Sequence, residues 1–234
     1  GKTAYWDTVT GESAPTCHRS QAAPIHIGGA APGPRSLNLA CSGATTGSKN
    51  WHKTWKPGID FAAGPTPAQD GQALQLQQFA TTHRVTMVTL SIGGNDLGFA
   101  NIVGACVRAY LNPLPGATCT TSDAYVNATS TDTKARVRDA ATRAILNIQT
   151  AMRNAGRPDN DWTLLLQLVP NPLPSLESAV PNQGLSRYRE NGCPLTDDVF
   201  TTVMPVLAAS TMNAATLQVH FESHGLTNVL SGTG

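Results

Sequence analysis

Val85-Thr86-Met87-Val88-Thr89-Leu90-Ser91-Ile92 runs without a break into Gly93-Gly94-Asn95-Asp96. The first eight residues are mostly β-branched or aliphatic and end at two glycines, a pattern that predicts a buried strand of a parallel sheet. Ligands of open α/β sheets bind outside the carboxyl ends of the strands, and paired glycines allow a close approach of backbone to substrate. Asn95 is therefore a candidate functional residue. The structural alternative is that Asn95 and Asp96 cap a helix that starts at Leu97.

Segments on both sides of this strand alternate between strand and helix patterns. Residues 36–40 predict a short strand, a Gln-rich stretch around Leu76 predicts a helix, and residues 51–67 read as loop. Residues 97–110 predict a further helix. The clearest helix has a stripe at steps of three and four and closes at Gly156 and Pro158; the stripe comprises Val137, Ala141, Ala144, Ile148, Met152 and Ala155.

The C-terminal third continues this alternation. Residues 162–169 predict a buried strand, and Thr196 predicts the cap of a helix with Asp197 and Asp198 in its first turn and a kink at Pro205. Residues 217–221 predict a last short strand. The sequence therefore predicts an α/β fold: a three-layer α/β/α sandwich with a parallel, flavodoxin-like sheet.

Length and charge narrow the class of protein. The chain of 234 residues suits one domain, so residues 1–234 are predicted to form a single domain. Lys and Arg number 16 and Asp and Glu 15, which argues against nucleic acid and anionic membrane as partners. Because no apolar run approaches the roughly 18 residues of a membrane span, no integral membrane segment is expected.

The five cysteines indicate an exported protein. The spacings of Cys17, Cys41, Cys106, Cys119 and Cys193 match no zinc pattern, and disulfides explain them better. Pairing between neighbours along the chain would join Cys17 to Cys41 and Cys106 to Cys119. Cys193 would then be a free thiol, form an intermolecular bond, or pair with a cysteine beyond the end of the chain. We therefore expect a secreted, extracellular protein.

Three segments together resemble one enzyme family in their order and spacing. They are Cys17-His18-Arg19-Ser20, Asn38-Leu39-Ala40-Cys41-Ser42-Gly43-Ala44-Thr45 and Leu90-Ser91-Ile92-Gly93-Gly94-Asn95-Asp96-Leu97-Gly98-Phe99. The chain resembles the SGNH/GDSL hydrolases, specifically the secreted actinobacterial branch of single-domain esterases and lipases. The Cys106/Cys119 loop and Gly192-Cys193-Pro194 fit the same branch.

The resemblance implies a serine hydrolase that acts on carboxylic esters. In that family a serine attacks the ester carbonyl, and the oxyanion is held by the backbone N–H of the serine, the backbone N–H of a glycine and the side-chain amide of an asparagine. Gly43 and Asn95 stand at the last two positions. Each such donor stabilises the transition state by roughly 2.7–4 kcal/mol. The resemblance implies no cofactor and no metal, a small-molecule or lipid ester as substrate, and a monomer.

Two family motifs have no counterpart in the chain. The nucleophile of the family sits in a Gly-Asp-Ser motif upstream of the first cysteine, where Gly11-Glu12-Ser13 is the nearest approach. The catalytic histidine sits in a C-terminal D-x-x-H, and Glu222-Ser223-His224 has the wrong spacing. We therefore expect a family member truncated at both ends, with the nucleophile, the histidine and a partner for Cys193 in the missing flanks.

Other interpretations of these residues remain open. A non-catalytic module could keep the cleft of the family to bind a ligand. Ser42 and His224 could act as a relocated nucleophile and base, although no G-x-S-x-G turn surrounds Ser42. His18 is expected to be a loop residue near the cleft. Residues 43–49 lack the spacing of a phosphate-binding loop, which disfavours nucleotide binding.

Overall fold

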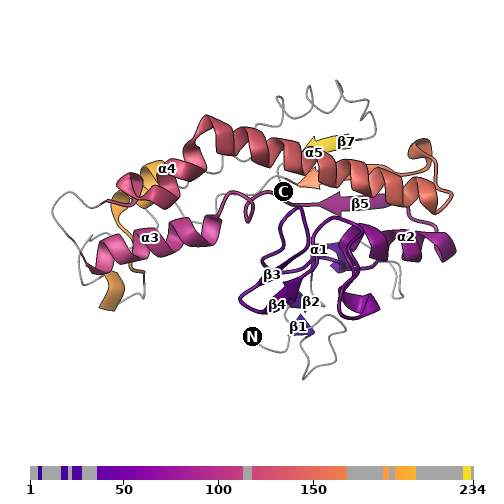
Figure 1. Cartoon of the computed structure of the whole chain (residues 1–234), viewed down its shortest axis with the longest axis horizontal. Coiled ribbons are helices and arrows are strands. Elements are labelled where there is room, and N and C mark those ends of the chain that lie inside the picture. The colour runs from indigo at the N-terminus through magenta and orange to yellow at the C-terminus, as the bar shows by residue number, and fades with distance from the viewer. Residues whose placement is uncertain are drawn as a thin grey trace. The chain divides into compact units, whose positions relative to one another are not determined.

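The computed structural model describes residues 5–6, 17–20, 23–27, 36–112, 118–167, 187–189, 193–203 and 229–232 (Figure 1). By its contacts the chain divides into two compact units. Unit 1 comprises Gly1–Ile92, Ala140–Leu166 and Leu226–Leu230; unit 2 comprises Gly93–Asp139, Gln167–Gly225 and Ser231–Gly234. The organisation of residues 1–234 as a single domain stays a prediction.

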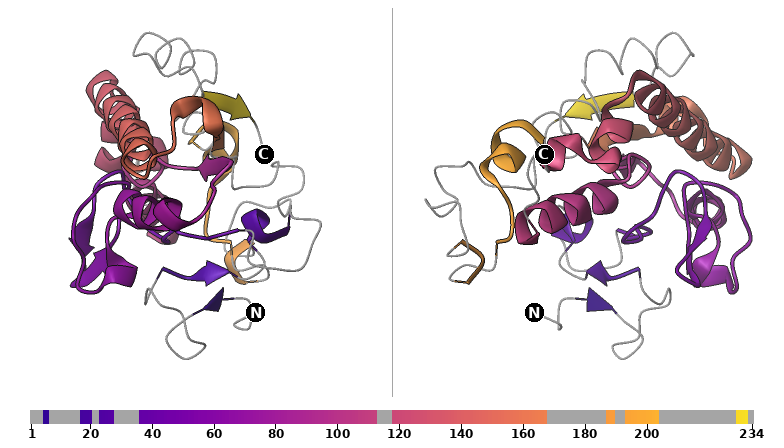
Figure 2. Two further views of the ribbon diagram at one scale, coloured as in Figure 1. Left: turned by 90° about the vertical axis from the view of Figure 1, so that its right-hand side faces the viewer. Right: turned by 60° about the vertical axis from the view of Figure 1, so that its left-hand side comes forward.

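The main sheet combines strands from distant parts of the sequence. It has the order β5-β6-β7, with β5 at Met87–Leu90, β6 at Thr163–Gln167 and β7, the yellow arrow in Figure 2, at Val229–Gly232. Strands β5 and β6 run parallel, with Met87 opposite Thr163 and Leu90 opposite Leu166. The mixed α/β class and the parallel pairing are thus confirmed. The three-layer sandwich stays a prediction, and the sequence patterns did not indicate β7.

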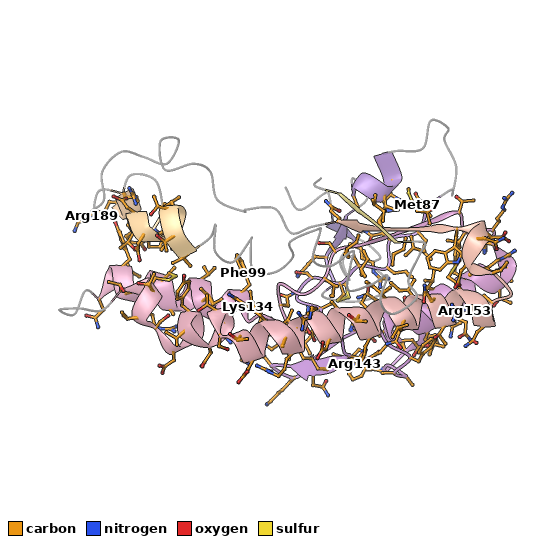
Figure 3. The ribbon with its side chains drawn as sticks, turned by 90° about the horizontal axis from the view of Figure 1, so that it is seen from above. Met87, Phe99, Lys134, Arg143, Arg153 and Arg189 are labelled. Atoms are coloured by element: carbon orange, nitrogen blue, oxygen red, sulfur yellow. A yellow bond between two sulfur atoms is a disulfide. The ribbon has the colours of Figure 1, made fainter. Side chains whose placement is uncertain are left out.

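Strand β5 is shorter and more exposed than its sequence suggests. Met87, labelled in Figure 3, is 50% exposed, Thr89 is also exposed, and only Leu90 of the strand is buried. Strand β6 alternates instead, with Leu164 and Leu166 fully buried. The prediction that β5 is buried on both faces is wrong, because Met87 and Thr89, which alternate along the strand and so share one face, are exposed.

Helices α2 and α5 follow the predicted pattern closely. Helix α2 spans Gln72–Thr82 and α5 spans Thr131–Asn154. Every member of the predicted stripe of α5 is buried except Ala155, which is half-buried, and Thr142, expected outside the stripe, is buried as well. Helix α5 ends as predicted at Gly156, whose φ is +75°. The N–H of Gly156 donates to Arg153 and that of Arg157 to Met152, the two bonds of a Schellman motif.

Side chains at the end of α5 bind the end of α2. Asn154 Nδ2 donates to Gln77 Oε1 at 3.0 Å, and the Arg157 guanidinium donates to the carbonyls of Ala80 and His83. Arg153, labelled with Arg143 in Figure 3, pairs with Asp159, and the hydrogen bond and charge of that carboxylate raise the pKa of Arg153. These contacts place the two helices side by side within unit 1.

Unit 1 also contains a two-stranded hairpin where a loop was predicted. Strand β3, Lys49–Trp51, pairs antiparallel with β4, Thr54–Lys56, and Trp51 lies opposite Thr54. The turn is therefore two residues long. Both turn residues have positive φ, 46° at His52 and 65° at Lys53, which defines a type I′ turn. Sequence patterns missed the hairpin because His-Lys is not among the residue pairs that normally signal this turn.

This turn provides a stability prediction. A left-handed conformation costs a residue other than glycine roughly 1–2 kcal/mol, and Asn-Gly is the preferred pair in a type I′ turn. We therefore expect His52→Asn with Lys53→Gly to raise the free energy of unfolding by about 1–2 kcal/mol. Urea unfolding measures the change. No gain in stability would mean that the turn is not of this type in solution.

The segment after the hairpin is fixed by one carboxylate. Asp60 accepts hydrogen bonds from the backbone N–H and the hydroxyl of Ser48, each at 2.6 Å, and from the N–H of Ala62 at 3.1 Å. The backbone at Gly71 packs directly on Asp60, so that a Cβ at this position would overlap it. Asp60 thereby ties Ser48, just before the hairpin, to the loop that follows it, which includes the short 3-10 helix η2 at Pro67–Gln69.

The N-terminal elements of unit 1 are short. Strands β1, Tyr5–Trp6, and β2, Arg19–Ser20, pair antiparallel, and α1 spans Pro24–Ile27. The strand predicted at residues 36–40 is absent, so that prediction is wrong. The backbone there bonds to side chains instead: Ala40 donates to Asn38, and the Arg19 guanidinium donates to the carbonyls of Leu39 and Ala40.

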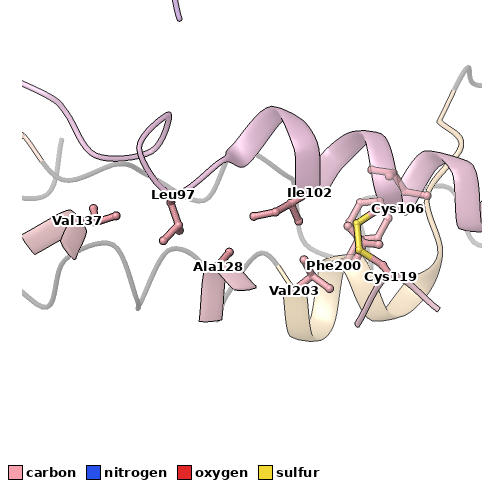
Figure 4. Packing of buried hydrophobic residues seen from close by; sticks show 10 residues of the cluster. Leu97, Ile102, Cys106, Cys119, Ala128, Val137, Phe200 and Val203 are labelled. Atoms are coloured by element: carbon pink, nitrogen blue, oxygen red, sulfur yellow. A yellow bond between two sulfur atoms is a disulfide. The ribbon is translucent and has the colours of Figure 1, made fainter. Parts of the chain in front are cut away.

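Unit 2 packs helices around a disulfide. Helix α3 spans Phe99–Leu111 and α4 spans Asp123–Thr129; η3 is at Cys119–Thr121. Cys106 and Cys119 are joined and fully buried, which confirms the predicted pair. Figure 4 shows the core around them, which consists of Leu97, Ile102, Cys106, Cys119, Ala128, Val137, Leu195, Val199, Phe200 and Val203.

The segment after Thr196 is helical, as predicted, but in a different form. Asp197 and Asp198 are α-helical, and Val199–Val203 form η5, a π-helix. Val199, Phe200 and Val203 are buried, in agreement with the predicted stripe. Asp197 forms an ion pair at 2.7 Å with the buried Arg187. Pro205 and the strand predicted at residues 217–221 lie outside the described residues. The remaining short helix, η4, is at Asp159–Asp161.

Candidate functional site

Gly43 occupies a tight turn in unit 1. The N–H of Ala44 donates to the carbonyl of Cys41 at 3.0 Å, which closes a four-residue turn. Gly43 is its third residue and has a φ of +78°. This is the left-handed position of a type II turn, where glycine is strongly preferred because it has no Cβ.

A disulfide and a buried arginine hold this turn. Cys17 and Cys41 are joined as predicted, with their Cα atoms 4.1 Å apart. The N–H of Ser42 donates to the carbonyl of Cys17 at 2.9 Å, so the bonded segments also share a backbone hydrogen bond. Arg19, 7% exposed, holds the carbonyls of Leu39 and Ala40 on the chain leading into the turn. The turn is therefore fixed on its N-terminal side.

The surroundings of Gly43 suit a role for its backbone N–H as a hydrogen-bond donor to a ligand. Its N–H makes no hydrogen bond to the part of the chain that the structure describes. Lys56 from β4 lies beside it: a Cβ built on Gly43 would be 3.8 Å from Lys56 Cε, and Lys56 is 5% exposed. Gly43 thus combines a backbone donor with a cationic side chain close by, an arrangement that would stabilise negative charge.

The turn predicts the effect of a Cβ at Gly43. Gly43→Ala places alanine in the left-handed region and meets nothing closer than 3.8 Å, so backbone strain is the only expected cost. We expect a loss of about 1–2 kcal/mol in the free energy of unfolding, measured in urea. Gly47→Ala is the matched control, since Gly47 has no positive φ and a Cβ there would be 3.9 Å from Asp60. Equal losses in both variants would contradict the turn geometry.

Asn95 occupies a glycine-rich turn in unit 2. Gly93 has a φ of +103°, which turns the chain sharply after Ile92. Three backbone hydrogen bonds then close the turn: Leu97 donates to Gly93 at 2.9 Å, Phe99 to Gly94 at 3.2 Å, and Gly98 to Asn95 at 3.2 Å. Asn95 is exposed at this turn. Three hydrogen bonds therefore fix the backbone that carries the exposed Asn95 side chain.

The geometry of this turn tests whether Asn95 or Asp96 caps helix α3. Helix α3 begins at Phe99, and its N-cap residue is Gly98, with a φ of 83° and no side-chain cap. The interpretation of Asn95 or Asp96 as the cap is therefore wrong, as is the start of the helix at Leu97. The reason is the length of the glycine turn, which continues for two residues past Asp96.

The two candidate donors belong to different units. Gly43 is in unit 1 and Asn95 in unit 2, and each is described within its own unit. Each lies in a turn that contains a left-handed glycine, Gly43 itself in the first and Gly93 in the second. Their convergence on one oxyanion stays a prediction.

The other catalytic candidates are only partly described. Ser42 is exposed beside Gly43, whereas His224 lies outside the described residues. His18 is exposed and has a positive φ of 54° next to Cys17. Ser42 therefore has the access that a nucleophile needs.

A serine and histidine that sequence patterns did not single out lie in contact. His26 Nδ1 and Ser36 Oγ are 2.7 Å apart, and both residues are half-buried. This distance is typical of a nucleophile and its base. In the described part of the chain no carboxylate hydrogen-bonds to His26, so a third member that would orient the ring is not seen there. No local motif surrounds either residue, which is why the sequence gave no signal.

Within the described ranges, no group of three or more His, Cys, Asp or Glu side chains could hold a metal ion. None of the helices in that part of the chain is long and apolar enough to cross a bilayer.

Comparisons with models of protein families, with curated proteins and with solved structures found no match to this chain. The resemblance to the SGNH/GDSL hydrolases therefore rests on the sequence motifs alone.

Proposed function

We propose that this chain is the greater part of a secreted, SGNH-type serine hydrolase of carboxylic esters. Gly43 supplies a backbone N–H, and Asn95 a side-chain amide, to the oxyanion of the tetrahedral intermediate. The observation that carries the proposal is the Gly43 turn, in which a left-handed glycine, whose N–H makes no hydrogen bond to the described residues, is fixed by the Cys17–Cys41 disulfide. A donor held in this way needs no reorganisation during the reaction.

The proposed chemistry is acyl transfer. The serine oxygen bonds to the ester carbonyl carbon, the π electrons move to the carbonyl oxygen, and a histidine takes the serine proton. The intermediate collapses and expels the alcohol, which receives that proton, and water then releases the acid by the same steps. We propose that the serine and the histidine lie outside these 234 residues. The two disulfides support folding in an oxidising, extracytoplasmic compartment.

A fluorophosphonate probe, which bonds covalently to activated serines, tests this proposal. We expect labelling and hydrolysis of short-chain nitrophenyl esters by the protein as its own organism secretes it, and no labelling of the 234-residue chain alone. Absence of both labelling and hydrolysis in the secreted protein would overturn the proposal. A module that binds an ester ligand without hydrolysing it would then replace it.

The contact between His26 and Ser36 supports a second candidate, in which the nucleophile lies within this chain. In that case the 234-residue chain would be labelled, and Ser36→Ala would abolish the labelling. Ser42→Ala is the matched control, because Ser42 is the exposed serine next to the proposed oxyanion donor. Labelling lost in Ser42→Ala but kept in Ser36→Ala would instead identify Ser42 as the nucleophile.

A further inference from the structure

The β3–β4 hairpin presents an unusual group of side chains. All five residues from Lys49 to Lys53 are exposed, and Trp51 is 48% exposed. Two of the five are lysines, and the ring of His52 lies 4.9 Å from that of Trp51. The exposed residues include His52 and Lys53, both residues of the turn. Their left-handed φ values strain the backbone, and a pair such as Asn-Gly would relieve that strain. Strain kept at a surface turn often marks a functional site.

Both faces of the hairpin are anchored through β4. Trp55 pairs with Asn50 across the ladder and is half-buried, and its indole N–H donates to the carbonyl of Gln69 at 2.7 Å. Lys49 and Trp51 alternate with Asn50 along β3 and share the other face with the buried Lys56, which lies opposite Lys49. The hairpin therefore holds Trp51 outward on a rigid support.

The surrounding sequence is strongly basic. No Asp or Glu occurs between Glu12 and Asp60, whereas five of the 16 Lys and Arg residues lie there. Of these five residues, two are buried, Arg19 and Lys56, and two are exposed on the hairpin, Lys49 and Lys53. The net charge of +1 conceals this local excess, and an anionic surface that approaches the hairpin meets its two exposed lysines.

We infer that the hairpin docks unit 1 on an anionic lipid surface. Trp51 would enter the headgroup region, where the amphipathic indole is favoured, and Lys49 and Lys53 would approach the lipid phosphates. A lipid surface fits better than a soluble ligand because the five residues, three of strand β3 and two of the turn, are all exposed, whereas small-molecule sites are concave and enclose the ligand. The inference does not depend on the proposed ester hydrolysis.

Vesicle binding by the full chain tests the inference. We expect the protein to cosediment with phosphatidylcholine vesicles that contain phosphatidylglycerol, and not with pure phosphatidylcholine. Binding should weaken as salt is raised, since exposed charges are screened. Tryptophan fluorescence should shift to the blue on binding, and Trp51→Phe should remove most of that shift.

Charge variants with a matched control identify the surface. Each lysine near an anionic bilayer contributes about a fivefold gain in affinity, so Lys49→Gln with Lys53→Gln should weaken binding about 30-fold. Trp51→Ala should weaken it at least about tenfold. Arg84→Gln with Arg143→Gln removes the same charge from exposed positions elsewhere in unit 1 and should change affinity by less than about twofold.

Three results would overturn the inference. They are equal binding to both kinds of vesicle, no binding to either, and equal losses in the lysine and arginine double variants. Binding to a soluble anionic polysaccharide without binding to vesicles would likewise replace the lipid surface by a glycan. Circular dichroism of each variant checks that it is folded, and the salt dependence of the unmodified protein needs no variant.

Discussion

Under the proposed function, Asn95→Ala is expected to lower kcat by about 10²–10³-fold, with little change in KM. The asparagine amide would bind the oxyanion, which exists only in the intermediate and its flanking transition states. Removing it therefore costs transition-state stabilisation and leaves substrate binding nearly intact. Because a neutral amide does not titrate, the ratio of wild-type to variant kcat should be constant across pH. Steady-state hydrolysis of a nitrophenyl ester measures both.

Asn101→Ala provides the matched control for this experiment. Asn101 is an exposed asparagine six residues further along, in the first turn of α3. Its replacement should leave kcat unchanged. An unchanged kcat in Asn95→Ala would remove Asn95 from the site and would leave Gly43 as the only proposed donor of this chain.

Removing the Cys17–Cys41 disulfide is expected to lower the free energy of unfolding by about 3.5 kcal/mol. The bond closes a loop with a sequence separation of 24 residues, and the estimate is the entropy that such a loop takes from the unfolded chain. Urea unfolding of Cys17→Ser with Cys41→Ser measures it. The Cys106–Cys119 bond, with a separation of 13, should contribute slightly less, about 3 kcal/mol.

The same pair of variants separates stability from function. Loss of Cys17–Cys41 releases the Gly43 turn, so kcat should fall even where the protein is fully folded. The Cys106–Cys119 double variant is the control, because that bond lies in the core of unit 2. Its loss should affect the proposed donor Asn95 only by lowering the stability of unit 2. Equal kcat values in the two double variants would contradict the role of the Gly43 turn.

Elements with a strong period were predictable from the sequence. The stripe from Val137 to Met152 identified α5 because a long amphipathic helix repeats its signal many times. The apolar runs at residues 85–92 and 162–169 identified β5 and β6, and their parallel pairing followed from the alternation of strands with helices. Both described disulfides followed from proximity along the chain.

Elements that depend on tertiary contacts were not predictable. The β3–β4 turn uses His52 and Lys53 in place of glycine and asparagine, so its local signal is missing. Residues 36–40 alternate like a strand, but the buried Arg19 takes up their carbonyls. The exposure of Met87 depends on what covers that face of β5, which no local pattern encodes.

The candidate site was likewise predictable from the sequence only in part. Gly43 and Asn95 were identified by resemblance to family motifs, and each lies in a turn with a left-handed glycine. The capping role considered for Asn95 and Asp96 was wrong because two further residues separate Asp96 from the helix. The contact between His26 and Ser36 joins loop residues ten positions apart, and only folding brings them together.

The bond between Cys17 and Cys41 has a consequence for where this protein can be made. A host that synthesises it in a reducing cytoplasm would produce a chain of correct length whose Gly43 turn is not closed by the bond. Under the proposed function, such material would hydrolyse an ester more slowly than protein in which the bond has formed. The specific activity of a preparation would then depend on whether the disulfide had formed. Export to an oxidising compartment would restore that activity without any change in sequence.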